Sequence, residues 1–325
     1  MTFSLLSPRS LQPHSLVSTS EQSDVRMAEW LISLEGTPAG ERLALILALQ
    51  AAFLHALFGA LQKSVTDPWT ARTVIDATYA IMAAPFALLV FPTAPAELWP
   101  LLVVVMILHI GYKTSQAAAY SAGAYTVVYP VVRGMGPVFT IFGAGLLFGE
   151  RFSPVQWLGV SVLVTGIMGL AIYNLRTIDV DRARLPLALG LAVLTGGFVA
   201  AYTTWDAYVI RAFENPFAFL AWFFFLDGLT MPTLGLIRRR GQLPQPIGAH
   251  IRLGVMGAVT AILSFGGILL ATRLDKVGEA AVLRETSVVF AAAIGWLMLG
   301  ERVGPRRLAL MALIALGAVI VEMGG

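Results

Sequence analysis

Long apolar runs follow one another from Arg42 onward, and short polar segments separate them. A bilayer core takes about 20 apolar residues per helix, and backbone groups in lipid must be hydrogen-bonded within their own segment, so helices are the spanning structure expected for such runs. Pairs such as Asp67-Pro68, Ser153-Pro154, Asn215-Pro216 and Gly304-Pro305 punctuate the runs. The pattern predicts helices at residues 43–62, 71–91, 98–118, 122–148, 155–174, 186–210, 216–236, 252–272, 278–299 and 306–323.

Residues 1–40 differ from the rest because they are rich in Ser, Pro and charge. Their short apolar stretch at 15–17 is no signal-peptide core, which needs about 7–15 apolar residues. We expect a disordered N-terminal tail over 1–40. Met27 is an alternative start of translation.

Composition places the chain among integral membrane proteins. Of its 325 residues 57% are hydrophobic and only 13% are charged, whereas a soluble domain carries about 25% charged residues. The net charge of +3 does not indicate nucleic-acid binding, because Lys and Arg sit mainly in short loops, where they set membrane orientation. The absence of cysteine excludes disulfides and cysteine metal sites. We therefore expect the lipid bilayer, and no nucleic acid, as a partner.

An internal repeat runs through the chain. A shift of 151 residues superposes the ends of the two halves without a gap, so that Arg133 falls on Arg284 and the Gly-Glu-Arg triplet at 149–151 falls on that at 300–302. Apolar helices match each other easily by composition, but a buried arginine and a charged triplet in register do not. The match indicates a duplication.

Five helices in each half is an odd number, so the second copy must enter the membrane upside down. We therefore predict an all-α integral membrane fold in which ten transmembrane helices form two inverted five-helix repeats, 42–175 and 186–324, around a central cavity. Inverted repeats suit alternating access, because one half can adopt the conformation of the other.

The orientation in the membrane stays open. If both termini are cytoplasmic, the inner side holds seven Lys and Arg residues against twelve on the outer side. The positive-inside rule then favours both termini outside. One missed helix would reverse the count for everything downstream.

Several segments resemble one family of transporters. They are GERFSPVQWLG at 149–159, GERVGPRR at 300–307, HALFGALQK at 55–63, AAYTTWD at 200–206 and LRETSVVFAA at 283–292. Together they resemble EamA-type transporters of the drug/metabolite transporter superfamily over about residues 42–323. The resemblance implies a ten-helix fold with a central cavity, export or uptake of metabolites, and the inner (plasma) membrane of a bacterium as location. It also implies cytoplasmic termini, against the charge count.

Ionisable residues inside the predicted helices are the candidate site residues, because each costs about 2.5–3.5 kcal/mol at mid-bilayer. Arg133 and Arg284 could reach one central cavity, where a guanidinium offers a bidentate fork to carboxylate or phosphate; the alternative is a role in helix packing. Glu285 is a candidate for proton coupling, or for a hydrogen bond to a neighbouring helix. Tyr129 shares a helix face with Arg133.

A second group of candidates lies in the predicted helix 186–210. Tyr202 and Asp206 are four residues apart and share a face, with Trp205 beside them. This stripe could form a cavity wall, or an aromatic belt at the membrane interface. Lys113 is a further candidate, although we favour a lysine that snorkels to the surface. We read the Phe223–Phe225 run as facing lipid and Asp227 as a partner for one of the arginines.

These features favour a secondary transporter, an exporter of small polar or anionic metabolites such as amino-acid-like compounds, working by alternating access. Coupling to protons and a homodimer are left open. The chain has no Walker A, HExxH or GxSxG motif, so we expect no enzyme, no cofactor and no metal. The alternatives are a non-transporting membrane scaffold or sensor and, less favoured, an intramembrane enzyme.

Overall fold

The computed structural model describes residues 19–63, 67–91, 93–123, 125–177, 182–238, 247–299 and 304–325, and the regular structure within them is helical. The first half contains α1 (Thr19–Ser33), α2 (Pro38–Lys63), α3 (Pro68–Pro85), the π-helix η1 (Phe86–Val90), the 3₁₀ turn η2 (Ala96–Leu98), α4 (Trp99–Ala122), α5 (Tyr125–Phe148) and α6 (Pro154–Thr177). The second half contains α7 (Leu185–Ala212), α8 (Pro216–Arg238), α9 (Ile247–Leu274), α10 (Val277–Arg284), α11 (Ser287–Leu299) and α12 (Pro305–Met323).

The predicted punctuation starts helices for identifiable reasons. The Asp67 carboxylate accepts hydrogen bonds from the backbone N–H of Trp69 and Thr70 at the start of α3. The Asn215 side chain does the same for α8. In each case a proline follows at the first helical position, where its missing N–H costs nothing. These side chains satisfy backbone donors that a helix start leaves unpaired.

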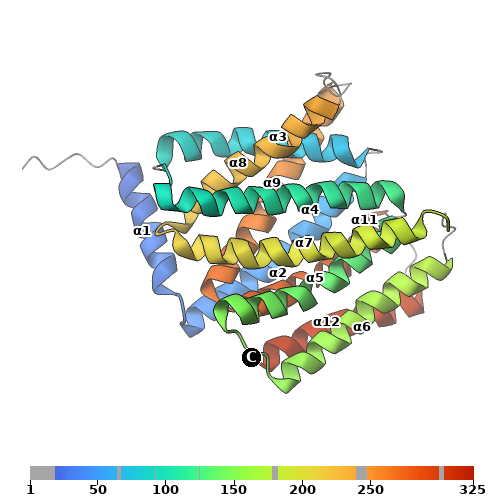
Figure 1. Cartoon of the computed structure of the whole chain (residues 1–325). Coiled ribbons are helices and arrows are strands. Elements are labelled where there is room, and N and C mark those ends of the chain that lie inside the picture. The colour runs from blue at the N-terminus through green and yellow to red at the C-terminus, as the bar shows by residue number, and fades with distance from the viewer. Residues whose placement is uncertain are drawn as a thin grey trace, which may run out of the picture.

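The expectation of a disordered tail over 1–40 is wrong from residue 19 onward, and residues 1–18 lie outside the described part. Helix α1 occupies Thr19–Ser33, and α2 already begins at Pro38. Leu31 of α1 is 2% exposed and joins an apolar cluster with residues of α2, α9 and α10. Glu35, just after α1, forms a 2.6 Å ion pair with Arg273. Figure 1 shows α1 at one end of the bundle, across the direction of α4 and α7. Docking onto the bundle orders this segment.

Eight helical segments of the described chain are long and apolar enough to cross a membrane: 38–59, 69–90, 96–122, 127–148, 154–177, 185–212, 216–238 and 250–274. Large apolar side chains such as Leu89 and Leu146 are more than 80% exposed on their outer faces, as in a protein surrounded by lipid. The last two predicted spans do not join them. The range 278–299 is divided into α10 and α11, and α12 carries Arg306, Arg307 and Glu322 near its ends.

The helices repeat with the 151-residue shift seen in the sequence. Shifted by that amount, α3 falls on α8, α6 on α12, and α5 on the combined range of α10 and α11. The members of each pair also pack together. Figure 1 shows α6 and α12 side by side.

The paired helices run antiparallel. In α3 and α8, the Thr73 hydroxyl reaches the Met231 carbonyl while Tyr79 bonds to Asp227, so residue numbers rise on one helix as they fall on the other. In α6 and α12, Ser153 bonds to Gly324 at one end and Arg307 bonds to Asn174 at the other. Equivalent helices of the two halves therefore point in opposite directions where they meet.

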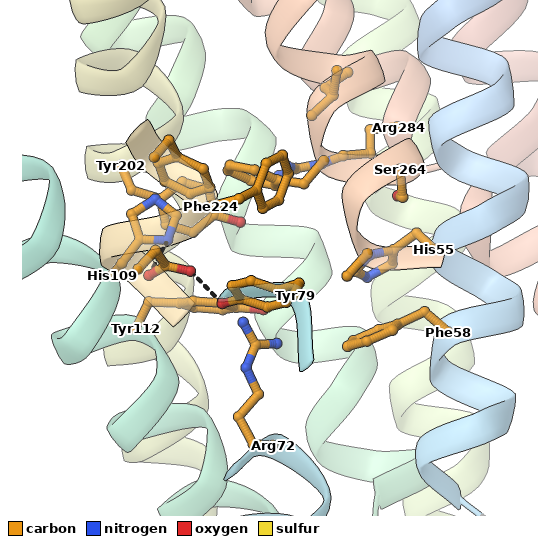
Figure 2. Close-up of a pocket in the computed structure, with 15 residues that line it drawn as sticks. His55, Phe58, Arg72, Tyr79, His109, Tyr112, Tyr202, Phe224, Ser264 and Arg284 are labelled. Atoms are coloured by element: carbon orange, nitrogen blue, oxygen red, sulfur yellow. Dashed lines mark hydrogen bonds and ion pairs between the residues drawn. The ribbon is translucent and has the colours of Figure 1, made fainter. Parts of the chain in front are cut away.

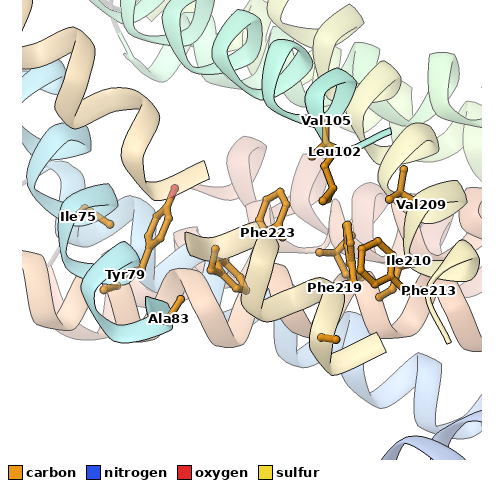
Figure 3. Packing of buried hydrophobic residues seen from close by; sticks show 14 of the residues in the cluster. Ile75, Tyr79, Ala83, Leu102, Val105, Val209, Ile210, Phe213, Phe219 and Phe223 are labelled. Carbon is orange, nitrogen blue, oxygen red and sulfur yellow. The ribbon is translucent and has the colours of Figure 1, made fainter. Parts of the chain in front are cut away.

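Apolar packing joins the two halves into one bundle. The largest cluster brings together side chains of α3, α4, α7, α8 and α9. Figure 3 shows Phe219 of α8 gathered with Ile210 and Phe213, and Phe223 near Leu102. Because α2 packs on α9 and α4 packs on α7, the halves interleave.

Glycines let α6 and α12 approach closely. A Cβ on Gly317 would lie 2.5 Å from the Leu163 backbone nitrogen, and one on Gly159 would lie 2.8 Å from the Gly317 carbonyl oxygen. Small residues at such crossings are what membrane helices use for close packing.

We expect Gly317→Val to destabilise the purified protein by about 1–3 kcal/mol, because overpacking forces the two backbones apart. The measurement is thermal unfolding in detergent. Gly190→Val is the matched control, because a Cβ there meets nothing within 4 Å. Equal melting temperatures for the two variants would contradict the assigned packing.

Candidate functional site

A small cavity of about 60 Å³ lies where helices of both halves meet, and we call it the polar cavity after the charged side chains on its wall. Figure 2 shows its lining, with Arg72 and Arg284 reaching in from opposite sides. Its volume holds a few water molecules, well below the 300–1,000 Å³ of ordinary ligand pockets. The lining residues are His55, Phe58, Arg72, Tyr79, His109, Tyr112, Tyr202, Phe223, Phe224, Asp227, Ala261, Ser264, Phe265, Ile268 and Arg284.

Arg284 is the last residue of α10 and is only 4% exposed. Its guanidinium lies 6.0 Å from the ring centroid of Tyr202, within cation–π range. Its Nε has no hydrogen-bond partner, and no described carboxylate lies within 4.0 Å of its nitrogens. A buried guanidinium without a counter-ion, facing a cavity, is a ready receptor for an anion.

The break between α10 and α11 fixes where Arg284 points. Glu285 and Thr286 form a tight turn there, in which backbone N–H groups bond three residues back. The Arg284 carbonyl accepts a hydrogen bond of 3.0 Å from Arg133 Nη2, which also donates to the Ser287 hydroxyl. The interruption of the predicted helix 278–299 is therefore held by a side chain from the other half.

Arg133 is used differently from its repeat partner Arg284. Its Nε lies 2.7 Å from Glu285 Oε2, and both side chains are at most 5% exposed. Tyr129 hydrogen-bonds to Ser287 beside them. The structure thus brings Arg133, Glu285 and Tyr129 together, but as a strut between α5 and the α10–α11 turn. Of the two predicted arginines, only Arg284 lines the cavity.

Lys113 does not snorkel, and the favoured interpretation of this residue was wrong. It is 1% exposed, and its Nζ lies 2.6 Å from Asp76, 2.8 Å from Asp227 and 3.0 Å from the Tyr79 hydroxyl. Arg72 also pairs with Asp76, at 2.9 Å. Asp227 is therefore the partner of a lysine rather than of an arginine. The two aspartates are separated by 151 residues, a repeat relation that could have flagged them in the sequence.

His109 connects this network to Asp206. Its Nε2 lies 2.8 Å from Asp206 Oδ2, and its Nδ1 lies 3.7 Å from Asp227 Oδ1. The imidazole packs against Tyr202 at 4.6 Å between centroids and against Phe223 at 5.0 Å. The predicted pair of Tyr202 and Asp206 thus does share one buried face, with Tyr202 lining the cavity and Asp206 behind His109.

The structure also tests the expectations for Trp205 and for the phenylalanine run at 223–225. Trp205 does not line the cavity: its indole N–H donates to the Leu101 carbonyl at 3.2 Å, and its ring contacts Tyr208. The lipid-facing assignment of the phenylalanine run was wrong for Phe223 and Phe224, which are 1% and 5% exposed. Successive helix residues point about 100° apart, so a run of three cannot share one environment.

Arg72 was missed as a site residue, because its position near a predicted helix start made it look like a loop charge. Ion pairing to Asp76 holds it inside the bundle instead. Four cationic side chains and four carboxylates lie in or beside the cavity wall, all of them buried except Arg72, whose side chain is 14% exposed. They are Arg72, Lys113, Arg133 and Arg284, with Asp76, Asp206, Asp227 and Glu285.

The first Gly-Glu-Arg triplet has a structural role. Gly149 adopts φ +69°, a conformation that favours glycine. The turn aims the Glu150 carboxylate at the start of α10, where it accepts hydrogen bonds from the backbone N–H of Val277 at 2.7 Å and Gly278 at 3.0 Å. A carboxylate at a helix N-terminus is favourable. The motif therefore anchors the helix that ends in Arg284. The second triplet, 300–302, lies outside the described residues.

Comparison with known proteins relates the second half of the chain to a family of transporters. Residues 186–323 match the model of the EamA-like transporter family. The second half is similar to this family. The resemblance predicted from the sequence is confirmed there, and the chain is a multi-pass membrane protein related to transporters.

The fold of most of the chain is shared with a solved structure. A solved crystal structure superposes with a TM-score of 0.70 at 16% identity, over 86% of this chain and 97% of that one. At this identity the likeness concerns the fold alone. A search of curated proteins found no match.

We expect Lys113→Met to lower stability by about 3–5 kcal/mol, because it leaves Asp76 and Asp227 buried with too few cations. Thermal unfolding of the purified protein measures the loss. The double variant Lys113→Met/Asp227→Asn should recover part of it, because one uncompensated carboxylate is removed as well. Equal melting temperatures for the single and double variants would show that the unpaired Asp227 is not the cause of the lost stability.

Proposed function

We propose that the protein is a secondary transporter that binds a small anionic metabolite, such as an amino-acid-like carboxylate, at Arg284. The observation that carries the proposal is the buried Arg284 guanidinium, which faces the cavity between the halves with no counter-ion among the described residues. A buried cation without an ion-pair partner is costly in a low-dielectric interior. A substrate carboxylate would complete it.

The arrangement of helices supports alternating access. Equivalent helices of the two halves pack antiparallel, as expected if ten spans form two inverted five-helix repeats, with α10 and α11 together as the ninth. In such a fold the substrate site lies at the repeat interface, on helices that are interrupted. Arg284 stands at such an interruption.

The small volume of the cavity fits a closed state of this cycle. At about 60 Å³ it is too small for an amino acid, so binding must coincide with an opening between the halves. Outward movement of metabolites across a bacterial inner membrane is the direction and location we propose, on the basis of the EamA-like resemblance.

Replacing Arg284 by Gln should abolish the solute changes that the wild type causes, because the amide keeps some hydrogen bonding but loses the charge. Cells overexpressing either form at equal membrane levels are compared by untargeted mass spectrometry of medium and extract. One class of anionic solutes should shift only with the wild type. Arg176→Gln, at an exposed position of α6, is the matched control and should behave like the wild type.

Purified protein in liposomes provides the decisive assay for any solute found. We expect uptake by Arg284→Gln to fall at least 100-fold and by Arg284→Lys to fall less, because lysine keeps the charge but loses the fork. Undiminished anion transport by Arg284→Gln would sink the proposal.

A further inference from the structure

A second, larger cavity lies beside the polar one. It is an apolar groove of about 420 Å³ between α1, α3 with η1, α8 and α9. This volume is within the usual range for ligand pockets. Its lining residues are Met27, Met82, Ala83, Phe86, Val90, Phe91, Phe217, Leu220, Ala221, Phe224, Ile262 and Gly266.

The groove runs inward from the outer surface of the bundle and borders the polar cavity at Phe224. At its rim, Phe86 is 54% exposed and Val90 is 43% exposed. At its inner end, Gly266 is buried and Phe224 is 5% exposed. Phe224 lines both spaces, so its ring is a shared wall. It rests edge-on against Tyr79, at 5.6 Å between centroids, and Figure 2 shows it among the residues of the polar cavity.

Local backbone features shape the groove. Pro85 lies inside the end of α3, where it cannot donate the usual backbone hydrogen bond, and the π-helix η1 follows, with Phe91 N–H bonded to the Phe86 carbonyl five residues back. On the opposite wall Gly266 leaves room: a Cβ there would meet only Phe224 and Leu220, at 3.7 and 3.8 Å. A larger side chain at this position would project into the groove.

We infer that the groove holds the apolar tail of the substrate, so that the transported molecule is an amphiphilic anion with its carboxylate at Arg284 and its hydrocarbon part beyond Phe224. The inference rests on the proposed function. The charged, confined cavity suits a small head group, and the apolar groove adjoining it suits a tail of several carbons. In this proposal the Phe224 ring rotates away so that the two spaces join. The tail enters from the bilayer through the rim of the groove.

Two probes with the same head test this: radiolabelled N-acetylglycine and N-decanoylglycine, in proteoliposomes corrected for flux into protein-free liposomes. For the wild type, we expect the half-saturating concentration of the decanoyl compound to be at least tenfold lower, because burial of its extra methylenes is favourable. Gly266→Phe should remove this advantage and leave acetylglycine uptake within twofold of the wild type. Gly190→Phe, at an open site on α7, is the matched control and should change neither.

The outcomes separate the two proposals. The tail site would be overturned, with anion transport left standing, if the wild type had equal half-saturating concentrations for both probes. It would also be overturned if Gly266→Phe kept the full decanoyl advantage. In that second case the groove holds bilayer lipid instead of the substrate tail. Equal losses for both probes in Gly266→Phe would overturn it too, because the damage would then be to packing. If the wild type moves neither probe, or Arg284→Gln moves both as the wild type does, the anion site fails and the tail site fails with it.

Discussion

The bundle depends on one constraint: charges placed in the interior of a membrane protein must find partners, and here the partners come from different helices. Lys113 of α4 reaches Asp76 of α3 and Asp227 of α8, so one ammonium ties together three helices from both halves. Breaking such a pair is costly because the remaining charge stays buried without a counter-ion or solvating water. Arg72, whose side chain is 14% exposed, and the buried Tyr79 complete the set.

A second buried pair creates the candidate site. Arg133 neutralises Glu285 and bonds to the carbonyl of Arg284, so the turn between α10 and α11 is held from the opposite half. The Arg133 guanidinium is therefore already engaged and is not available to bind a substrate anion. The duplication gave each half an arginine at the same position, and the asymmetry between the copies leaves one of them free.

The two cavities suggest how one chain could select its cargo. In the proposed transport cycle, charge at Arg284 selects the head of the substrate, and the apolar groove beyond Phe224 selects the rest of the molecule. Phe224 lines both spaces, so in this proposal the selectivity for the two parts of a substrate is linked at that residue. Glu150 holds the start of α10, which sets the position of Arg284 at its other end.

The sequence by itself determined the class of protein, the helical ranges up to their breaks, the duplication and the buried arginines. These follow from local rules: run length, proline and capping residues, and register against a repeat. It could not decide the break after Arg284, the burial of Lys113, or the turning inward of Phe223 and Phe224, and it missed the docked helix α1. Each of these depends on a side chain from a distant helix, such as Arg133 on the α10–α11 turn or Asp227 on Lys113. Only the tertiary structure decides which of two equivalent arginines keeps a partner, because pairing is a matter of distance in space rather than of spacing along the chain.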